Sequence, residues 1–203
     1  MAKPYLKRKE RIIINAIDIL DQGGINGLTM KEIARQQEIT EPAVYRHFTN
    51  KQEVVLTILN RFGSFDQTLM NTITESFMKP DEAILYFIES YATYYQNYPQ
   101  IITVLFSYDV YRYDPSALEQ MKAIMERRNR FIASLVEEGM KSGIFVRDHS
   151  AESDAEMLLG QLWASMYQWK LDGCKGNLKE RIMMRIRWMI RHMGSIGKQR
   201  EGG

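Results

Sequence analysis

The sequence predicts an all-α protein of about nine helices, and three observations lead to this fold class. Apolar residues recur every three or four positions along nearly the whole chain, which is the period of an amphipathic helix. Several of these segments follow a residue typical of helix N-caps, with a glutamate three positions later. Only 144–146 has the composition of a strand, and three residues are too few to build a sheet.

The helix boundaries follow from caps and breakers. A Ser, Thr, Asp or Asn side chain satisfies free backbone amides in the first turn, glycine ends a helix, and proline is tolerated only near the start. On these rules the expected helices are one ending at Gly23 and Gly24, 29–36 after Thr29, 40–47 after Thr40, 51–77 after Asn50, Asp81 to Asn97, Pro99 to Phe106, Ser116 to Gly143, Ser150 or Ser153 to Gly173, and Asn177 to Gly194. A loop is expected between Phe106 and Ser116, and a loose tail over 194–203.

Composition excludes several classes of protein. The 203 residues include 45% hydrophobic and 26% charged residues, with a net charge of +2. A single cysteine, Cys174, cannot form an internal disulfide. No apolar run approaches the roughly 20 residues that span a bilayer, and the first residues lack the apolar core of a signal peptide. We therefore expect a soluble cytoplasmic protein with no membrane partner.

The residue patterns of catalysis are missing from the sequence. The three histidines, His47, His149 and His192, lie far apart without metal-ligand spacing. There is no glycine-rich phosphate loop after a strand and no Gly-x-Ser-x-Gly nucleophile motif. We therefore expect neither an enzyme nor a cofactor or metal site.

The two short helices over 29–36 and 40–47 are separated by a tight turn. Apolar residues able to hold them together are Ile33, Ala34, Ile39, Val44 and Phe48. This spacing fits a helix-turn-helix, whose second helix enters the major groove of DNA, although short helix pairs also serve structural roles. Five basic residues and one acid within 1–11 indicate either a basic arm for DNA or a solvated end.

The residue identities in this region resemble one family. Ile-Thr-Glu-Pro-Ala-Val-Tyr-Arg-His-Phe at 39–48 and Thr-Asn-Lys-Gln-Glu at 49–53 closely resemble the TetR family of bacterial transcriptional regulators, as do Ile-Leu-Asp-Gln-Gly-Gly at 19–24 and Leu-Thr-Met-Lys-Glu-Ile-Ala at 28–34. The likeness covers about residues 8–60, and the rest is similar only in helix pattern and length. It implies a helix-turn-helix DNA-binding domain over 1–50, with the motif at about 29–48, and a ligand-binding and dimerisation domain over 51–203.

The resemblance also implies roles for individual residues. The implied contacts are phosphates for Thr29, Thr40 and Lys51, the DNA backbone for Tyr45 and His47, and bases for Glu41, Pro42, Ala43 and Arg46. Arg46 is the best candidate for a bidentate contact to guanine. Each has a plainer alternative, because the threonines could be caps only, Tyr45 and His47 structural, and Arg46 a phosphate contact.

One residue departs from the family pattern in the turn. Many relatives have glycine where this sequence has Glu38, which would cost about 1 kcal/mol more than glycine in a left-handed conformation. Together with Glu41 it places acids close to the phosphates, which leaves the operator sequence and the affinity open.

The family's last two helices form a dimer interface, which implies a four-helix bundle between two copies. The corresponding apolar residues are Leu158, Leu162, Trp163, Met166, Ile182, Ile186, Met189 and Met193. The alternative is an intramolecular core.

Eight tyrosines lie between residues 86 and 113, and their apolar bodies with polar tips suit a pocket for a mainly apolar ligand. The candidate pocket residues are Phe62, Tyr86, Tyr91, Tyr94, Tyr95, Met121 and Met125. Ordinary packing is the alternative for any one of them.

The resemblance, together with these patterns, implies a homodimeric regulator that binds a pseudo-palindromic operator in double-stranded DNA. Repression, the family's usual mode, would end when a hydrophobic or amphipathic small molecule binds the C-terminal domain. One alternative is an effector-independent DNA-binding protein with an architectural or division-linked role. Another is an all-α small-molecule binding protein or enzyme with an inert helix-turn-helix.

Overall fold

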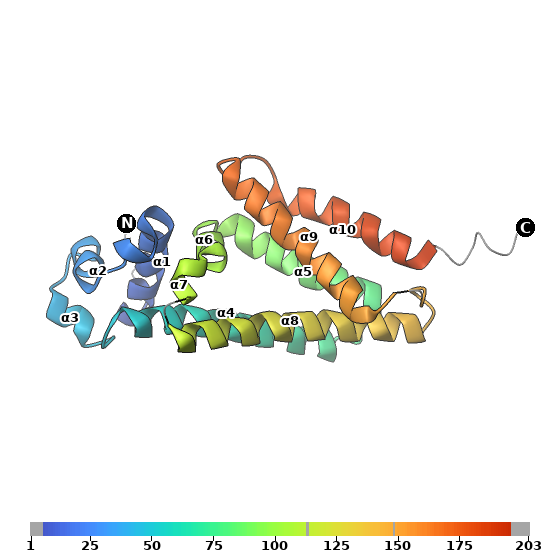
Figure 1. Cartoon of the computed structure of the whole chain (residues 1–203), viewed down its shortest axis with the longest axis horizontal. Coiled ribbons are helices and arrows are strands. Elements are labelled where there is room, and N and C mark those ends of the chain that lie inside the picture. The colour runs from blue at the N-terminus through green and yellow to red at the C-terminus, as the bar shows by residue number, and fades with distance from the viewer. Residues whose placement is uncertain (1–5, 113, 148, 196–203) are drawn as a thin grey trace, which may run out of the picture. The chain divides into compact units, whose positions relative to one another are not determined.

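A computed structural model describes residues 6–112, 114–147 and 149–195. The described residues form ten helices and no strand (Figure 1), which confirms the all-α prediction. They are α1 Arg8–Gly27, α2 Met30–Gln36, α3 Glu41–Tyr45, α4 Lys51–Glu75, α5 Pro80–Asn97, α6 Gln100–Phe106, α7 Tyr108–Tyr111, α8 Pro115–Lys141, α9 Ala151–Leu171 and α10 Leu178–Ser195. Within these ranges no helix is long and apolar enough to cross a membrane.

The chain forms two compact units, each made from two stretches of sequence. The first contains residues up to Ser64 together with Gln100–Ile124, and the second contains Phe65–Pro99 together with the residues from Met125 onward. The helices α4 and α8 each contribute one part to each unit. A functional boundary at residue 50 stays a prediction.

The first unit is built around α1. This helix packs against α2, α6 and α7, and its apolar face with Ile12, Ile13 and Leu20 is buried. The hydroxyl of Thr103 on α6 donates a hydrogen bond to the Asp21 carboxylate of α1. The helix is interrupted at Gly24, near the predicted end, and one further helical turn reaches Gly27.

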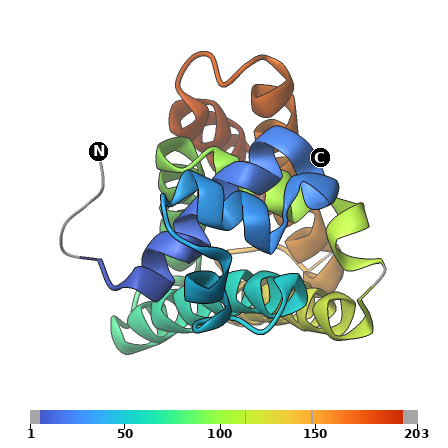
Figure 2. The same cartoon turned by 90° about the vertical axis from the view of Figure 1, so that its left-hand side faces the viewer.

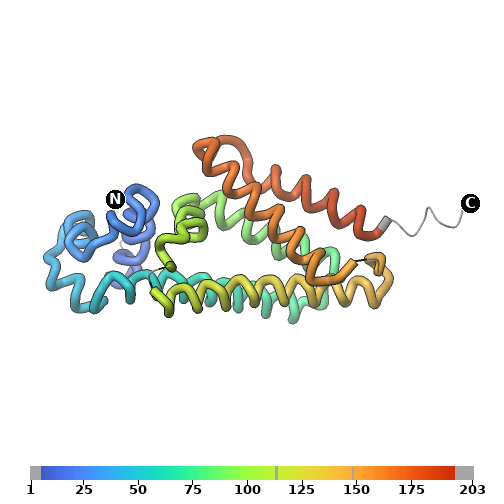
Figure 3. Tube along the Cα trace, in the orientation of Figure 1, coloured from blue at the N-terminus to red at the C-terminus, as the bar shows by residue number. Residues whose placement is uncertain are grey.

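The second unit has a charged pair in its core. In this unit α5 packs against α9 and α10, which also pack against each other (Figure 3). The guanidinium of Arg128 donates two hydrogen bonds of 2.8 and 2.9 Å to the carboxylate of Asp66, and both side chains are fully buried. Tyr91 donates its hydroxyl to Asp66, and its ring lies 4.6 Å below the guanidinium. Each charge is therefore compensated by a partner of opposite charge and by hydrogen bonds, which offsets the cost of removing both charges from water.

Several predicted boundaries were wrong, and local chemistry explains why. The cap of α8 is Asp114, not Ser116, because the Asp114 carboxylate accepts from the backbone amides of Ser116 and Ala117. Pro80 rather than Asp81 begins α5. The long helix α4 stops at Glu75, before the predicted end at residue 77, and Phe77 is 94% exposed.

Two other regions also differ from the expectation. The predicted loop after Phe106 contains the short helix α7. Residues 144–146 form no strand, although the amide of Val146 donates to the carbonyl of Met193. The predicted C-terminal tail falls mostly at 196–203, outside the described residues.

Candidate nucleic-acid interface

The first helix of the motif, α2, begins at a side-chain cap. Thr29 accepts a hydrogen bond of 3.0 Å from the backbone amide of Glu32, as the cap prediction requires. The Glu32 carboxylate in turn accepts hydrogen bonds from Arg35 and Gln36. The bond from Arg35 is the main cause that lowers the pKa of Glu32 to about 2. Gln36 also accepts from Asn15, which ties α2 to α1.

The turn after α2 is a Schellman motif with a glutamate at its left-handed position. The amide of Ile39 donates to the carbonyl of Ala34 at 3.0 Å, and the amide of Glu38 donates to the carbonyl of Arg35 at 3.3 Å. Glu38 has a φ of 52°, a conformation that glycine adopts at lower cost. The left-handed geometry expected from the resemblance is therefore kept without glycine, and the turn sets the direction in which α3 leaves α2.

The second helix, α3, separates a buried side from an exposed side. Val44 and the following Phe48 are fully buried. The exposed residues are Thr40, Glu41, Pro42, Tyr45 and Arg46, and His47 is half-buried. Ala43 is only 7% exposed, so it is the least accessible of the predicted base contacts. Figure 2 shows α2 and α3 facing the viewer at the end of the first unit.

Thr40 occupies the N-cap position of α3 but forms no side-chain cap hydrogen bond. Its hydroxyl is exposed, and the amides of Ala43 and Val44 donate to its backbone carbonyl instead. The cap hydrogen bond expected at Thr40 is therefore absent, and the side chain is available for another acceptor or donor.

The start of α4 is capped by neighbouring side chains. The Asn50 side chain accepts from the amide of Glu53 at 2.9 Å, and the Glu53 carboxylate accepts from both the amide and the hydroxyl of Thr49. The bond from the Thr49 amide is the main cause that lowers the pKa of Glu53. Lys51 follows directly, half-buried, as the first residue of α4.

A basic residue that sequence reasoning did not assign lies against this junction. The ammonium of Lys9 is 5.0 Å from the ring centroid of Phe48. The only sequence signal for it was the cluster of basic residues at the N-terminus. Because α1 begins at Arg8, the residues from Arg8 to Arg11 belong to a helix and not to an arm, whereas residues 1–5 lie outside the described residues.

The seven predicted pocket residues do not all lie in one unit. Phe62 and Met121 belong to the first unit, and Tyr86, Tyr91, Tyr94, Tyr95 and Met125 to the second. In the second unit, Tyr91 and Tyr95 are fully buried around the Asp66–Arg128 pair, while Tyr86 is exposed. Burial is the main cause that raises the pKa of both buried phenols, so they remain neutral at ordinary pH. An effector site at these residues stays a prediction.

Most of the predicted dimer contacts are buried inside a single chain. Leu158, Leu162, Met166, Ile182 and Ile186 are each at most 2% exposed, which favours the alternative of an intramolecular core for these five. Trp163, Met189 and Met193 are partly accessible. The large exposed apolar residues of α9 and α10 are Met157, Tyr167, Leu171, Met184 and Trp188.

These features define a class of protein. Two short helices are held by a capped start, a fixed turn and a shared apolar core, and the second presents one polar side to solvent, which is a helix-turn-helix module of DNA-binding proteins. The family model described as "Bacterial regulatory proteins, tetR family" matches residues 12–58, which contain this module. The match assigns the likeness to the TetR family to the N-terminal module of the chain.

Comparison with individual proteins agrees with this assignment. The chain is 34% identical over 64 residues to an uncharacterized HTH-type transcriptional regulator, YuxN, of Bacillus subtilis strain 168. The match covers 31% of this chain and 21% of that protein, so the chain spans about a fifth of the length of this curated relative.

Two solved structures share the fold over nearly the whole chain. The ketosteroid transcriptional regulator KstR2 of Mycobacterium tuberculosis has a TM-score of 0.81 at 14% identity, covering 95% of this chain and 97% of that one. The transcriptional regulator FadR of Bacillus subtilis, in complex with stearoyl-CoA, has a TM-score of 0.75 at 15% identity, covering 93% and 98%. At these identities the likeness shows the fold alone.

Proposed function

We propose that the protein is a sequence-specific DNA-binding transcriptional regulator that acts in the bacterial cytoplasm. The observation that carries this proposal is the exposed side of α3, which leaves Arg46 and Tyr45 accessible while Val44 and Phe48 anchor the helix. An α-helix fits the major groove, where each base pair presents a distinct pattern of donors and acceptors.

The accessible residues suit different contacts with DNA. Arg46 is the proposed reader of a guanine, because a guanidinium can donate two hydrogen bonds to its major-groove edge. Glu41 can accept from a cytosine amino group, and Pro42 can contact a thymine methyl group. The proposed contacts to the sugar-phosphate backbone are Thr29, Thr40, Tyr45, His47 and Lys51.

Selection of duplex DNA from a random library, at two salt concentrations, tests sequence-specific binding. We expect enrichment of a pseudo-palindrome. Arg46→Ala should relax the preference at one position per half-site by about 1–3 kcal/mol. The control Arg130→Ala removes an exposed arginine of α8 and should leave the selected sequence unchanged. Retention of DNA without any enriched sequence would contradict specific recognition.

We propose a homodimer that joins through the exposed apolar residues of α9 and α10 rather than through the buried ones. Met157 on α9 and Trp188 on α10 are each more than half exposed, and they line one apolar pocket of about 200 Å³. Exposed apolar side chains that gather on one surface mark protein–protein contacts when the patch is large enough. A symmetric dimer would present two α3 helices to two half-sites.

Sedimentation equilibrium tests the dimer directly. Trp188→Glu should shift the population toward the monomer, because it places a charge in a desolvated interface. Tyr108→Glu, which changes an exposed aromatic residue of the first unit, is the matched control and should remain dimeric. An unchanged dimer in Trp188→Glu would move the interface elsewhere.

We further propose repression that is relieved by an amphipathic small molecule bound to the C-terminal part. The stearoyl-CoA complex of the FadR neighbour supports this choice. Stearoyl-CoA added to the complex with the selected duplex should weaken DNA binding, whereas CoA alone should not. If both are without effect at ten times the protein concentration, acyl-CoA is not the effector.

The second candidate is an effector-independent DNA-binding protein. It is favoured by one observation, that Tyr91 and Tyr95 are fully buried around the Asp66–Arg128 pair. The same titration separates the two, because this candidate binds its duplex with one affinity whatever small molecule is added.

A further inference from the structure

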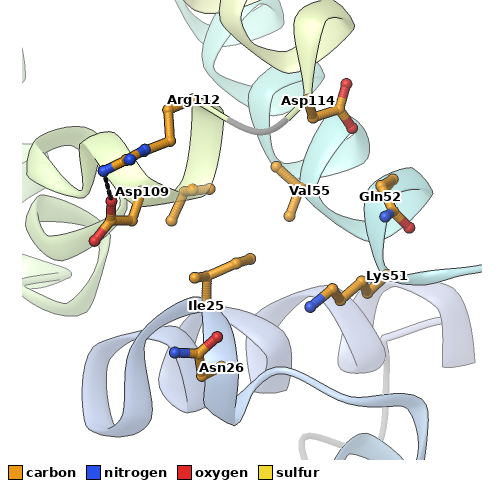
Figure 4. A pocket seen from close by; sticks show the side chains of 9 residues that line it. Ile25, Asn26, Lys51, Gln52, Val55, Asp109, Arg112 and Asp114 are labelled. Carbon is orange, nitrogen blue, oxygen red and sulfur yellow. Dashed lines mark hydrogen bonds and ion pairs between the residues drawn. The ribbon is translucent and has the colours of Figure 1, made fainter.

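A polar pocket of about 390 Å³ lies within the first unit, beside the proposed DNA interface (Figure 4). This volume is in the range of small-molecule sites. Its apolar part consists of Val55 of α4, Val110 of α7 and Ile25, of which the two valines are buried. The remaining lining residues are polar or charged: Asn26, Lys51, Gln52, Asp109, Arg112 and Asp114.

The charges of this pocket are unequally satisfied. Arg112 pairs with Asp109 at 3.2 Å. One oxygen of Asp114 accepts from two backbone amides at the start of α8. Lys51 forms no hydrogen bond and no ion pair with any residue the structure describes, and its half-buried side chain extends toward Ile25 (Figure 4). A partly desolvated ammonium without a partner favours binding of an anionic group.

We propose that this pocket binds a small polar molecule with one carboxylate or phosphate group and at least one hydrogen-bond donor. Lys51 supplies the charge for the anionic group, and the amide side chains of Gln52 and Asn26 supply further hydrogen bonds. The donor of the ligand faces the acidic side of the pocket, where Asp114 keeps one carboxylate oxygen outside its helix cap. Two acids in the lining disfavour ligands with several negative charges.

The position of the pocket gives its ligand a route to the DNA interface. Asn26 lies three residues before Thr29, the cap of α2, and Lys51 is the first residue of α4. Both Thr29 and Lys51 are proposed phosphate contacts, so this consequence rests on the proposed function. A ligand whose anionic group holds Lys51 competes with a DNA phosphate for the same ammonium. A polar effector in this pocket therefore acts on DNA binding through Lys51, and it needs no site in the apolar core of the second unit.

Binding itself can be tested without DNA, on the full chain, by amide NMR. The probes are inorganic phosphate, which carries only the anionic group, and phosphoethanolamine, which adds an ammonium donor. Saturable shifts are expected at Asn26, Gln52 and Val110, with tighter binding of phosphoethanolamine. Lys51→Gln should weaken its binding about tenfold to a hundredfold, the usual effect of losing a charged hydrogen bond. Lys31→Gln, which removes an exposed lysine of α2 outside the pocket, should bind normally.

A second variant tests whether the ligand occupies the volume of the pocket, and it leaves the charge of Lys51 unchanged. Asn26 is exposed at the edge of the pocket, and Asn26→Phe should block the site while leaving Lys51 in place. Equal shifts in Lys51→Gln and in the wild type would mean an adventitious ion only, and would overturn the proposal. Absence of saturation at millimolar probe would also overturn it. Because no DNA is present, either failure leaves the proposed DNA binding untouched.

Discussion

Replacing Glu38 by glycine should stabilise the protein. Glu38 lies at the left-handed position of the Schellman turn, with a φ of 52°, and its side chain is exposed. A residue with a Cβ atom pays about 1–2 kcal/mol in this conformation. Glycine itself lowers the free energy of unfolding by about 0.5–1 kcal/mol, because it makes the unfolded chain more flexible, and this offsets part of the gain. The net expectation for Glu38→Gly is a gain of about 0.5–1 kcal/mol in the free energy of unfolding.

Urea denaturation followed by circular dichroism measures this gain in the free energy of unfolding, at one fixed protein concentration so that association does not contribute. In a separate thermal scan the midpoint of unfolding should rise by about 1–4 °C for a chain of 203 residues. Glu38→Gln is the matched control, because it removes the charge and keeps the Cβ atom. Equal stability of the glycine and glutamine variants would show that charge, not backbone conformation, decides the effect, and the reasoning from φ would be wrong.

Two further predictions concern charged groups. Arg128→Met leaves the buried carboxylate of Asp66 without its partner and should cost about 3–5 kcal/mol in urea denaturation, whereas Arg128→Met with Asp66→Leu should recover much of the loss. Arg35→Gln should raise the pKa of Glu32 from about 2 toward its ordinary value of 4.5, measured by carbon NMR of the carboxyl group. Because folding lowers this pKa, the stabilisation from Glu32 is present above about pH 4.5 and disappears as the pH falls through about 2. A pKa of Glu32 unchanged by Arg35→Gln would contradict the assigned cause.

The parts of the fold set by local chemistry could be predicted from the sequence. The side chains of Thr29 and Asn177 each accept from the backbone amide three residues later, as their spacing indicated. Of the two candidates at the start of α9, Ser150 is the cap. The prediction failed where two candidates compete locally. At the start of α8 the cap is Asp114 and not Ser116. The proline that follows Asp114 suits the first helical position, because the amide hydrogen that proline lacks has no partner within the helix there.

The features set by long-range packing could not be predicted in this way. The Asp66–Arg128 pair joins residues 62 positions apart, and helical periodicity contains no information about which distant side chains meet. The same limit applies to the predicted dimer residues, which stay a prediction. On α9 both Leu158 and Met157 are apolar, and periodicity alone cannot tell which of the two faces the chain's own core. The helix-turn-helix module was easier to predict, because its residue identities and spacing lie within one short segment.

The buried ion pair also restricts how this sequence can change over evolutionary time. A change of Asp66 alone or of Arg128 alone leaves an uncompensated charge in the core, and such a step loses much of the stability of a typical domain. Replacement by two apolar residues is tolerated, but it has to pass through one of these weakened intermediates. In an alignment of close relatives we therefore expect positions 66 and 128 to keep the pair or to change together.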